Sequence, residues 1–259
     1  MDRAVRFALD ARPAHRFITE NLTTGDVYEA AVVIYLTRRL SAGALFVDIG
    51  AHAGYFACIA GVLGATVHAI EPQRPLITVI ERNIELNGLD RVHPLHAAIS
   101  DQDGMTGMLR LTSSPGLQVH GEFRNPDTPD PHNRHTDWVP LLRLDTLYDR
   151  LEIVPRVVKI DVEGMELRVL AGAEKLIAGG KTAFVIEIHP HLISRFQGRL
   201  MDIADRFAGD RWRVFDLSDR RGHTTTLAEG LAKAAEGTEA EDGRVTLAIE
   251  PAFWTGGPA

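Results

Sequence analysis

The sequence predicts an α/β protein with a Rossmann-like, mostly parallel sheet and helices on both faces. Short apolar strands alternate with helices of about ten residues, which indicates parallel pairing with right-handed crossovers. The first strand ends in a glycine turn, and polar residues directly follow several later strands. A chain of 259 residues is long enough to bury the core of one such domain.

The expected elements begin with a helical prelude at residues 1–44, in which Tyr28–Leu40 is apolar at helical spacing. Residues 45–259 form the predicted domain. Its strands are expected at Leu45–Ile49, Thr66–Ile70, Val92–Ile99, Val157–Val162, Ala183–Ile188, Trp212–Leu217 and Arg244–Ile249. Its clearest helices are expected at Gly54–Leu63, Leu76–Leu86 and Met165–Ile177. An antiparallel course for the last two strands is left open.

The regular alternation is interrupted between about residues 104 and 140. Ser113–Gly116 and Asn125–Pro131 are rich in proline and polar residues. This composition predicts an exposed β-hairpin or lid-like insertion with a mobile tip. The alanine- and glutamate-rich run Ala228–Asp242 predicts a surface helix or loop.

The composition is that of a soluble enzyme with an acidic balance. The formal net charge is -7 and the pI is near 5.9, whereas nucleic-acid binders usually carry a basic face and a higher pI. Cys58 is the single cysteine, so no intramolecular disulfide can form. The first residues contain no apolar segment typical of a signal peptide, and no run is long enough to span a bilayer. We therefore expect a cytoplasmic protein.

A glycine turn follows the first predicted strand, where Asp48-Ile-Gly50-Ala-His-Ala-Gly54 leads into a helix. Gly50 and Gly54 permit positive φ and let the backbone approach a ligand closely. Glu71 comes at the end of the second predicted strand, where an acidic side chain can accept both hydroxyls of a ribose.

Two classes of cofactor use this geometry. A dinucleotide requires G-x-G-x-x-G, but here the spacing is Gly50-x-x-x-Gly54, and Asp48 would repel a pyrophosphate. S-adenosylmethionine (SAM) has no phosphate, and its sulfonium and ammonium groups are attracted by a carboxylate. The turn therefore predicts SAM as the cofactor. The alternative is a purely structural turn, which the offset of Glu71 makes less favoured.

Polar residues lie inside and after the fourth and fifth predicted strands. Lys159 is expected to be buried and so to need a partner, for which we expect Glu187 on the neighbouring strand. Asp161, Glu163 and His189 follow the strands at the edge where α/β sheets bind ligands.

These residues are the candidates for catalysis. If the methyl acceptor is a hydroxyl, a base within hydrogen-bond reach takes its proton, and His189 has the most suitable unperturbed pKa. Each candidate also has a structural alternative: Asp161 orders the loop, Glu163 caps the next helix, and His189 binds a backbone carbonyl. Together with Lys159 they form the predicted catalytic set.

Histidine pairs raise the question of a metal site. His189-Pro-His191 and His132-Asn-Arg-His135 lack convincing ligand spacing, and no cysteine cluster supports them. A magnesium site at Asp161 is conceivable because such sites need few protein ligands. We expect no bound metal.

At these residues the chain resembles the FkbM-type branch of the class I SAM-dependent methyltransferases. The most specific stretch is Val158-Lys-Ile-Asp-Val-Glu-Gly-x-Glu166. The other matching segments are Tyr28-Glu29, Val47–Tyr55, Ala69-Ile-Glu-Pro72, Asn83-x-x-x-Asn87, Leu144-Asp145, Leu170-x-Gly172 and Glu187-x-His189. The resemblance covers roughly residues 25–220.

The resemblance implies a seven-stranded sheet of order 3-2-1-4-5-7-6 and O-methylation of a natural product or sugar. It implies that cofactor-binding residues come from the prelude and from the ends of the strands. Asp48, Gly50 and His52 would line the methionine part, Glu71 the ribose and Ala98–Ser100 the adenine, with Glu29, Gly54, Pro72 and Asp161 completing the set. His52 stands where many relatives have Asn, but a neutral imidazole can also donate.

Our functional hypothesis is a SAM-dependent O-methyltransferase acting on a small-molecule or carrier-bound hydroxyl substrate. An RNA or protein methyltransferase is the alternative on the same scaffold, opposed by the acidic balance and by the lack of an Asn-Pro-Pro-Tyr-like motif. A non-catalytic cofactor-binding protein is opposed by the presence of Asp48, Glu71 and Lys159. No nucleic acid or membrane partner is expected, and the acceptor and a homodimer are left open.

Overall fold

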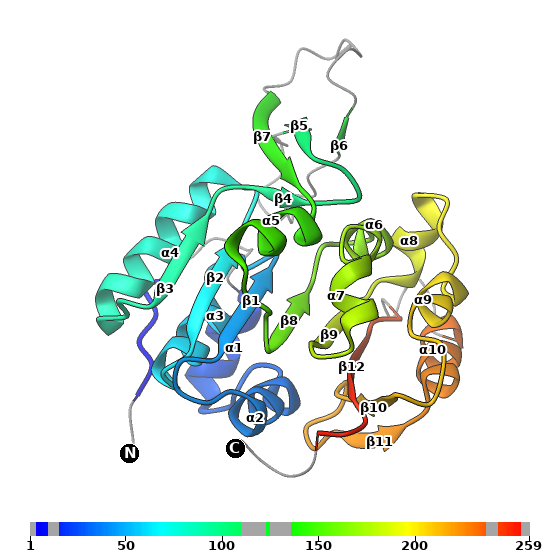
Figure 1. Ribbon diagram of the computed structural model, residues 1–259. Coiled ribbons are helices and arrows are strands. Elements are labelled where there is room, and N and C mark those ends of the chain that lie inside the picture. The colour runs from blue at the N-terminus through cyan, green and yellow to red at the C-terminus, as the bar shows by residue number, and fades with distance from the viewer. Residues whose placement is uncertain (1–3, 10–15, 110–122, 125–135, 237–242, 255–259) are drawn as a thin grey trace.

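The computed structural model describes residues 4–9, 16–109, 123–124, 136–236 and 243–254. An eight-stranded sheet runs through its centre in the order β3-β2-β1-β8-β9-β12-β10-β11 (Figure 1). These strands are β1 (Leu45–Ile49), β2 (Thr66–Ile70), β3 (Val92–Leu95), β8 (Val157–Ile160), β9 (Ala183–Ile188), β10 (Trp212–Asp216), β11 (His223–Thr225) and β12 (Val245–Pro251).

The strand order confirms the α/β class and the predicted topology. The strands from β3 to β9 pair in parallel, while β12 is antiparallel to both β9 and β10. Without β11, the order is the expected 3-2-1-4-5-7-6 in chain numbering. The additional strand β11 pairs with β10 at the edge of the sheet, and its three polar residues gave no apolar signal in the sequence.

Helices cover both faces of this sheet, and adjacent strand residues enter different cores. Phe46 belongs to one core, together with α1 (Arg16–Thr24), α2 (Ala30–Arg39), α3 (Tyr55–Val62) and α4 (Arg74–Asn87). Val47 belongs to the other core. That core is covered by α5 (Leu144–Leu151), α6 (Glu166–Ala171), α7 (Glu174–Gly179), α8 (Pro190–Arg195), α9 (Met201–Arg206) and α10 (Leu227–Glu236).

A smaller sheet stands beyond the end of β3, at the top of Figure 1. It has the order β4-β7-β5-β6 and consists of β4 (Ala98–Ile99), β5 (Gly104–Leu109), β6 (Phe123–Arg124) and β7 (Thr136–Leu142). The antiparallel pair of β5 and β7 confirms the expected hairpin. The segments expected to form its tip, Ser113–Gly116 and Asn125–Pro131, lie outside the described residues, as does His132-Asn-Arg-His135.

The third strand was predicted as one unit over Val92–Ile99, and this is wrong because the chain changes sheet within it. The break falls at His96, whose ring lies 2.9 Å from the carbonyl oxygen of Pro72.

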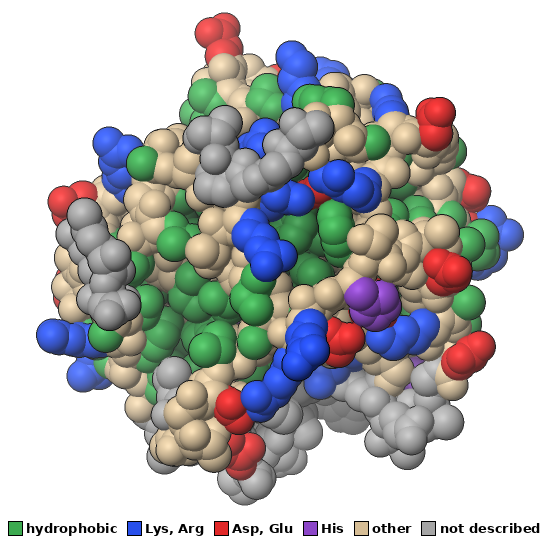
Figure 2. Space-filling model, turned by 90° about the horizontal axis from the view of Figure 1, so that it is seen from below, with side chains coloured by type: hydrophobic (Ala, Val, Ile, Leu, Met, Phe, Trp, Pro, Cys, Tyr) green, Lys and Arg blue, Asp and Glu red, His purple; other side chains and the backbone are tan. Residues whose placement is uncertain are grey.

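On the side away from the smaller sheet, the surface has a hollowed apolar area with Lys and Arg side chains beside it (Figure 2). No described helix has the length and apolar character needed to cross a membrane.

Candidate functional site

The glycine turn connects β1 to α3 at the carboxyl edge of the sheet. Gly50 has φ 80° and Gly54 has φ 78°, as the spacing predicted. A Cβ atom on Gly50 would lie 1.8 Å from the carbonyl oxygen of Asp161, so this glycine is required by the approach of the turn to the chain that leaves β8. The turn and the end of β8 are therefore held against each other.

Glu71 follows β2, and its carboxylate is fixed by two backbone amides. The amide of His52 donates to Oε2 at 3.0 Å, and that of Gln73 donates to Oε1 at 2.8 Å. The side chain is buried, and burial raises the pKa of Glu71 to about 8 although both hydrogen bonds oppose the shift. Each oxygen retains acceptor capacity, so the carboxylate can still receive hydroxyl groups.

Asp48 lies inside β1, directly opposite Lys159 of β8 in the parallel register. It is buried, and neither of its carboxylate oxygens accepts a well-formed hydrogen bond from the described residues. Burial raises the pKa of Asp48 to about 6, against the attraction of the Lys159 charge. A buried carboxylate without hydrogen bonds is unusual and favours a cationic ligand nearby.

Lys159 is also buried, but the expectation that it pairs with Glu187 is wrong. Its ammonium lies 2.9 Å from Asp161 Oδ2 and 4.7 Å from the centre of the Phe56 ring. The register places Val185 opposite Lys159, so Glu187 lies two residues further along β9. Glu187 instead pairs with Arg244 at 3.0 Å.

The remaining cofactor candidates lie at other edges of the site. Glu29 precedes α2 with φ 44°, and its buried Oε2 has no hydrogen-bond partner among the described residues. Burial raises the pKa of Glu29, while Lys159 opposes the shift. Ala98 and Ser100 are buried where the chain enters the smaller sheet, and the Ser100 hydroxyl donates to Asp101.

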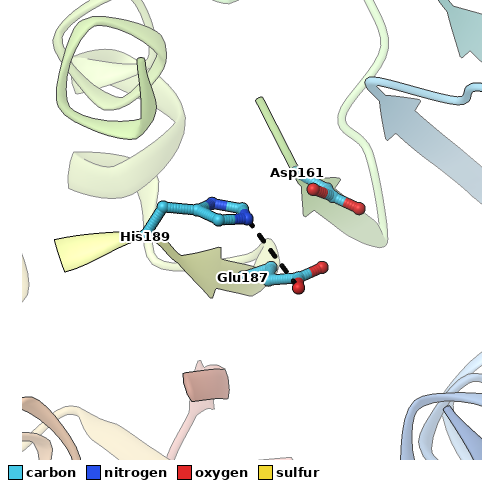
Figure 3. Close-up of side chains that lie close together, drawn as sticks. All are labelled: Asp161, Glu187 and His189. Carbon is cyan, nitrogen blue, oxygen red and sulfur yellow. Dashed lines mark ion pairs between the residues drawn. The ribbon is translucent and has the colours of Figure 1, made fainter. Parts of the chain in front are cut away.

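His189 follows β9 and points toward two carboxylates (Figure 3). Atoms of Asp161, Glu187 and His189 that can bind a metal all lie within 4.8 Å of one another. The ring Nδ1 lies 2.7 Å from Glu166 Oε1, while Nε2 is 3.7 Å from Glu163 Oε2 and 3.8 Å from Glu187 Oε1. The structure thus brings three of the four predicted catalytic residues, Asp161, Glu163 and His189, to one place, and Lys159 joins them through Asp161.

The surroundings of His189 change its acidity. Burial lowers the pKa of His189, but the hydrogen bond to Glu166 and the charges of Glu166, Asp161 and Glu163 outweigh burial and raise it to about 9. The prediction of a general base started from the unperturbed value near 6.5. The shifted value leaves the free imidazole protonated at neutral pH, so acceptance of a proton requires a further change at the site.

The residues of this site lie within a segment that matches a protein-family model. Residues 48–220 match the model of the methyltransferase FkbM domain, which covers more than half of the chain and includes Asp48, Glu71, Lys159 and His189. The chain belongs to the FkbM methyltransferase family. A comparison with curated proteins gives no match.

Two solved structures similar to this FkbM family member are those of methyltransferases. The methyltransferase FkbM from Methylobacillus flagellatus KT has 19% sequence identity and a TM-score of 0.50, and the match covers 82% of this chain and 44% of that one. Magnesium protoporphyrin IX methyltransferase from Synechocystis PCC 6803, solved with bound SAM, has 12% identity, a TM-score of 0.47, and coverage of 96% and 88%. The chain thus spans less than half of the first relative, and the likeness concerns the fold.

Two functional candidates in this FkbM domain received no such role from the sequence. Glu166 is fully buried at the start of α6, and its carboxylate forms a hydrogen bond with the His189 ring. The sequence indicated Glu166 only as the last residue of a family motif. Glu187 faces His189 and Asp161, whereas it was expected to neutralise Lys159. The sequence could have indicated both residues, because they belong to the Val158–Glu166 and Glu187-x-His189 segments that carry the family resemblance. Their contacts were not predictable, because they depend on strand register.

Proposed function

We propose that this FkbM family member is a SAM-dependent O-methyltransferase that acts on a hydroxyl of a natural product or sugar. The observation that supports it best is the pair of buried carboxylates, Asp48 and Glu71, at neighbouring strand ends beside the glycine turn. When bound, SAM supplies a methyl group on a positively charged sulfur and leaves as neutral S-adenosylhomocysteine (SAH).

The described residues fit this cofactor. Asp48 has two buried carboxylate oxygens that accept no well-formed hydrogen bond from the described residues, and it offers its charge to the cationic methionine part. Glu71 is held by two backbone amides and offers its remaining lone pairs to the ribose hydroxyls. We assign His52, Gly50, Gly54 and Glu29 to the walls around the methionine part, and Pro72, Ala98 and Ser100 to the nucleoside part.

The acceptor hydroxyl is assigned to the cluster of Asp161, Glu163 and His189. A hydroxyl is a weak nucleophile and must lose its proton as the oxygen–carbon bond forms. His189 is oriented by Glu166 and directs Nε2 toward the carboxylates after β8 and β9. We propose that this cluster activates the hydroxyl, with the acidic balance of the chain favouring a small-molecule or carrier-bound acceptor in the cytoplasm.

Thermal unfolding with cofactors tests the proposal directly. SAH at a hundredfold excess over its dissociation constant is expected to stabilise the protein by about 2.7 kcal/mol, because it binds the folded state alone. NAD is expected to leave the melting temperature unchanged, because Asp48 repels a pyrophosphate. Stabilisation by NAD and not by SAH would overturn the assignment of the cofactor.

Glu71→Gln is expected to weaken SAH binding by about 10- to 100-fold, as for the loss of hydrogen bonds to a charged group. The side-chain NH2 of the glutamine replaces one of the two acceptor oxygens. It therefore faces the backbone N–H of either His52 or Gln73, and that N–H loses its acceptor. Isothermal titration calorimetry measures the affinity. Glu81→Gln, an exposed change on α4, is the control and should bind SAH as the unmodified protein does. Equal affinities of the two variants would remove Glu71 from the cofactor site.

A further inference from the structure

Three side chains from two adjacent strand ends converge beside the assigned cofactor site. Asp161 follows β8, Glu187 lies in β9, and His189 follows β9 (Figure 3). One ligand atom from each lies within 4.8 Å of the others, a spacing that a single metal ion can bridge. No metal was expected from the sequence, in which the histidine pairs lack ligand spacing and Asp161 alone suggested a magnesium site; the approach of Glu187 and His189 to Asp161 depends on strand register.

The histidine of this cluster is oriented as a metal ligand. Because the Glu166 carboxylate accepts, Nδ1 of His189 carries the proton of their 2.7 Å hydrogen bond. Binding of a metal ion displaces the second ring proton from Nε2, and the lone pair of that atom then faces the ion. This atom is buried, lacks a hydrogen-bond partner among the described residues, and faces Glu187 at 3.8 Å, too far for a hydrogen bond. A carboxylate on the other ring nitrogen is the usual second partner of a metal-binding histidine.

The carboxylates around this cluster outnumber the cations that pair with them. Lys159 and Arg244 neutralise only the carboxylates of Asp161 and Glu187. Glu163 adds a further negative charge at 3.7 Å from His189 Nε2. Like charges at such distances repel strongly unless a positive charge lies between them.

We propose that Asp161, Glu187 and His189 bind a divalent first-row transition ion such as Mn²⁺ or Zn²⁺. An imidazole with two carboxylates suits these ions better than Mg²⁺ or Ca²⁺, which prefer oxygen ligands alone. Three protein ligands leave coordination positions open. A Lewis acid at this place would lower the pKa of the acceptor hydroxyl, with His189 serving as a ligand. That role rests on the proposed function, whereas the binding site itself does not.

Titration of the full chain with Mn²⁺, without cofactor or acceptor, tests the site. Electron paramagnetic resonance follows the loss of the free-ion signal, and Zn²⁺ is tested by competition. We expect one saturable site. His189→Asn and Glu187→Gln should each weaken Mn²⁺ binding at least about tenfold, and Glu166→Gln about tenfold through the ring orientation.

Glu71→Gln is the matched control, because Glu71 is a buried carboxyl of the same edge that is not one of the three proposed ligands. It should retain Mn²⁺ binding, while Glu187→Gln and His189→Asn should retain SAH binding, which also shows that they are folded. Absence of Mn²⁺ and Zn²⁺ binding, or equal Mn²⁺ affinity in His189→Asn and the unmodified chain, would overturn the proposal. Mn²⁺ binding without SAH binding would support the metal site and contradict the proposed function.

Discussion

His189→Ala is expected to lower kcat by about 100-fold or more, the range for loss of a group that activates a nucleophile. His189 Nε2 is needed both to remove a proton and to bind a cation. The alanine variant therefore loses the contribution of His189 whichever of these two roles it has. SAH affinity should change by less than about twofold, because His189 touches the acceptor side and not Asp48 or Glu71. The measurement is SAH formation with the acceptor identified from a panel of hydroxyl-bearing natural products and sugars.

His191→Ala provides the control for this prediction. His191 is exposed on α8, two residues further along the chain, and the described structure places it outside the cluster. Its kcat should stay within about twofold of the unmodified enzyme. A His189→Ala enzyme with the same kcat as His191→Ala would show that His189 has no part in activating the acceptor.

Lys159→Met is expected to lower the free energy of unfolding by about 3–5 kcal/mol, the cost of removing one partner from a buried ion pair. Asp161 loses its ammonium partner at 2.9 Å, and Asp48 loses the positive charge opposite it in the register. The midpoint of urea unfolding measures the change, with an unchanged slope showing that the unfolded state is unaffected.

Two further variants isolate the charge effect. Lys175→Met removes an exposed lysine that pairs with Asp149, and it should leave the midpoint of urea unfolding nearly unchanged because solvent screens this pair. The double change Lys159→Met with Asp161→Asn should cost less than the sum of the single changes, because the unpaired charge is also removed. If Lys159→Met lowers the free energy of unfolding no more than Lys175→Met does, the buried pair of Lys159 and Asp161 does not stabilise the fold.

The buried pair of Lys159 and Asp161 also affects the charge of the site. Replacing a buried ion pair by apolar residues is often neutral, so Lys159 and Asp161 are weak evidence for selection on stability alone. In this FkbM family member Lys159 is opposite Asp48, which we assign to the cofactor, and its ammonium contacts the cluster residue Asp161. Its positive charge opposes the effect of burial on the pKa of both Asp48 and Asp161, and so favours their ionised forms.

The parts of the fold that could be predicted depend on local pattern. Alternating apolar strands and helices gave the parallel sheet, and Gly50 and Gly54 marked a turn with positive φ. Glu71 was identified from its place after β2. The position of β11 was not predictable, because a short polar strand at an edge is stabilised by pairing with β10.

Local residue patterns were enough to predict the class of fold, the family resemblance and the two carboxylates of the assigned cofactor site, because strand ends and turns are encoded by neighbouring residues. The pairing of Lys159 with Asp161, the orientation of His189 by Glu166 and the approach of Glu187 became visible only in the folded chain. These contacts join separate segments, and a shift of one residue in strand register would direct each side chain to the opposite face.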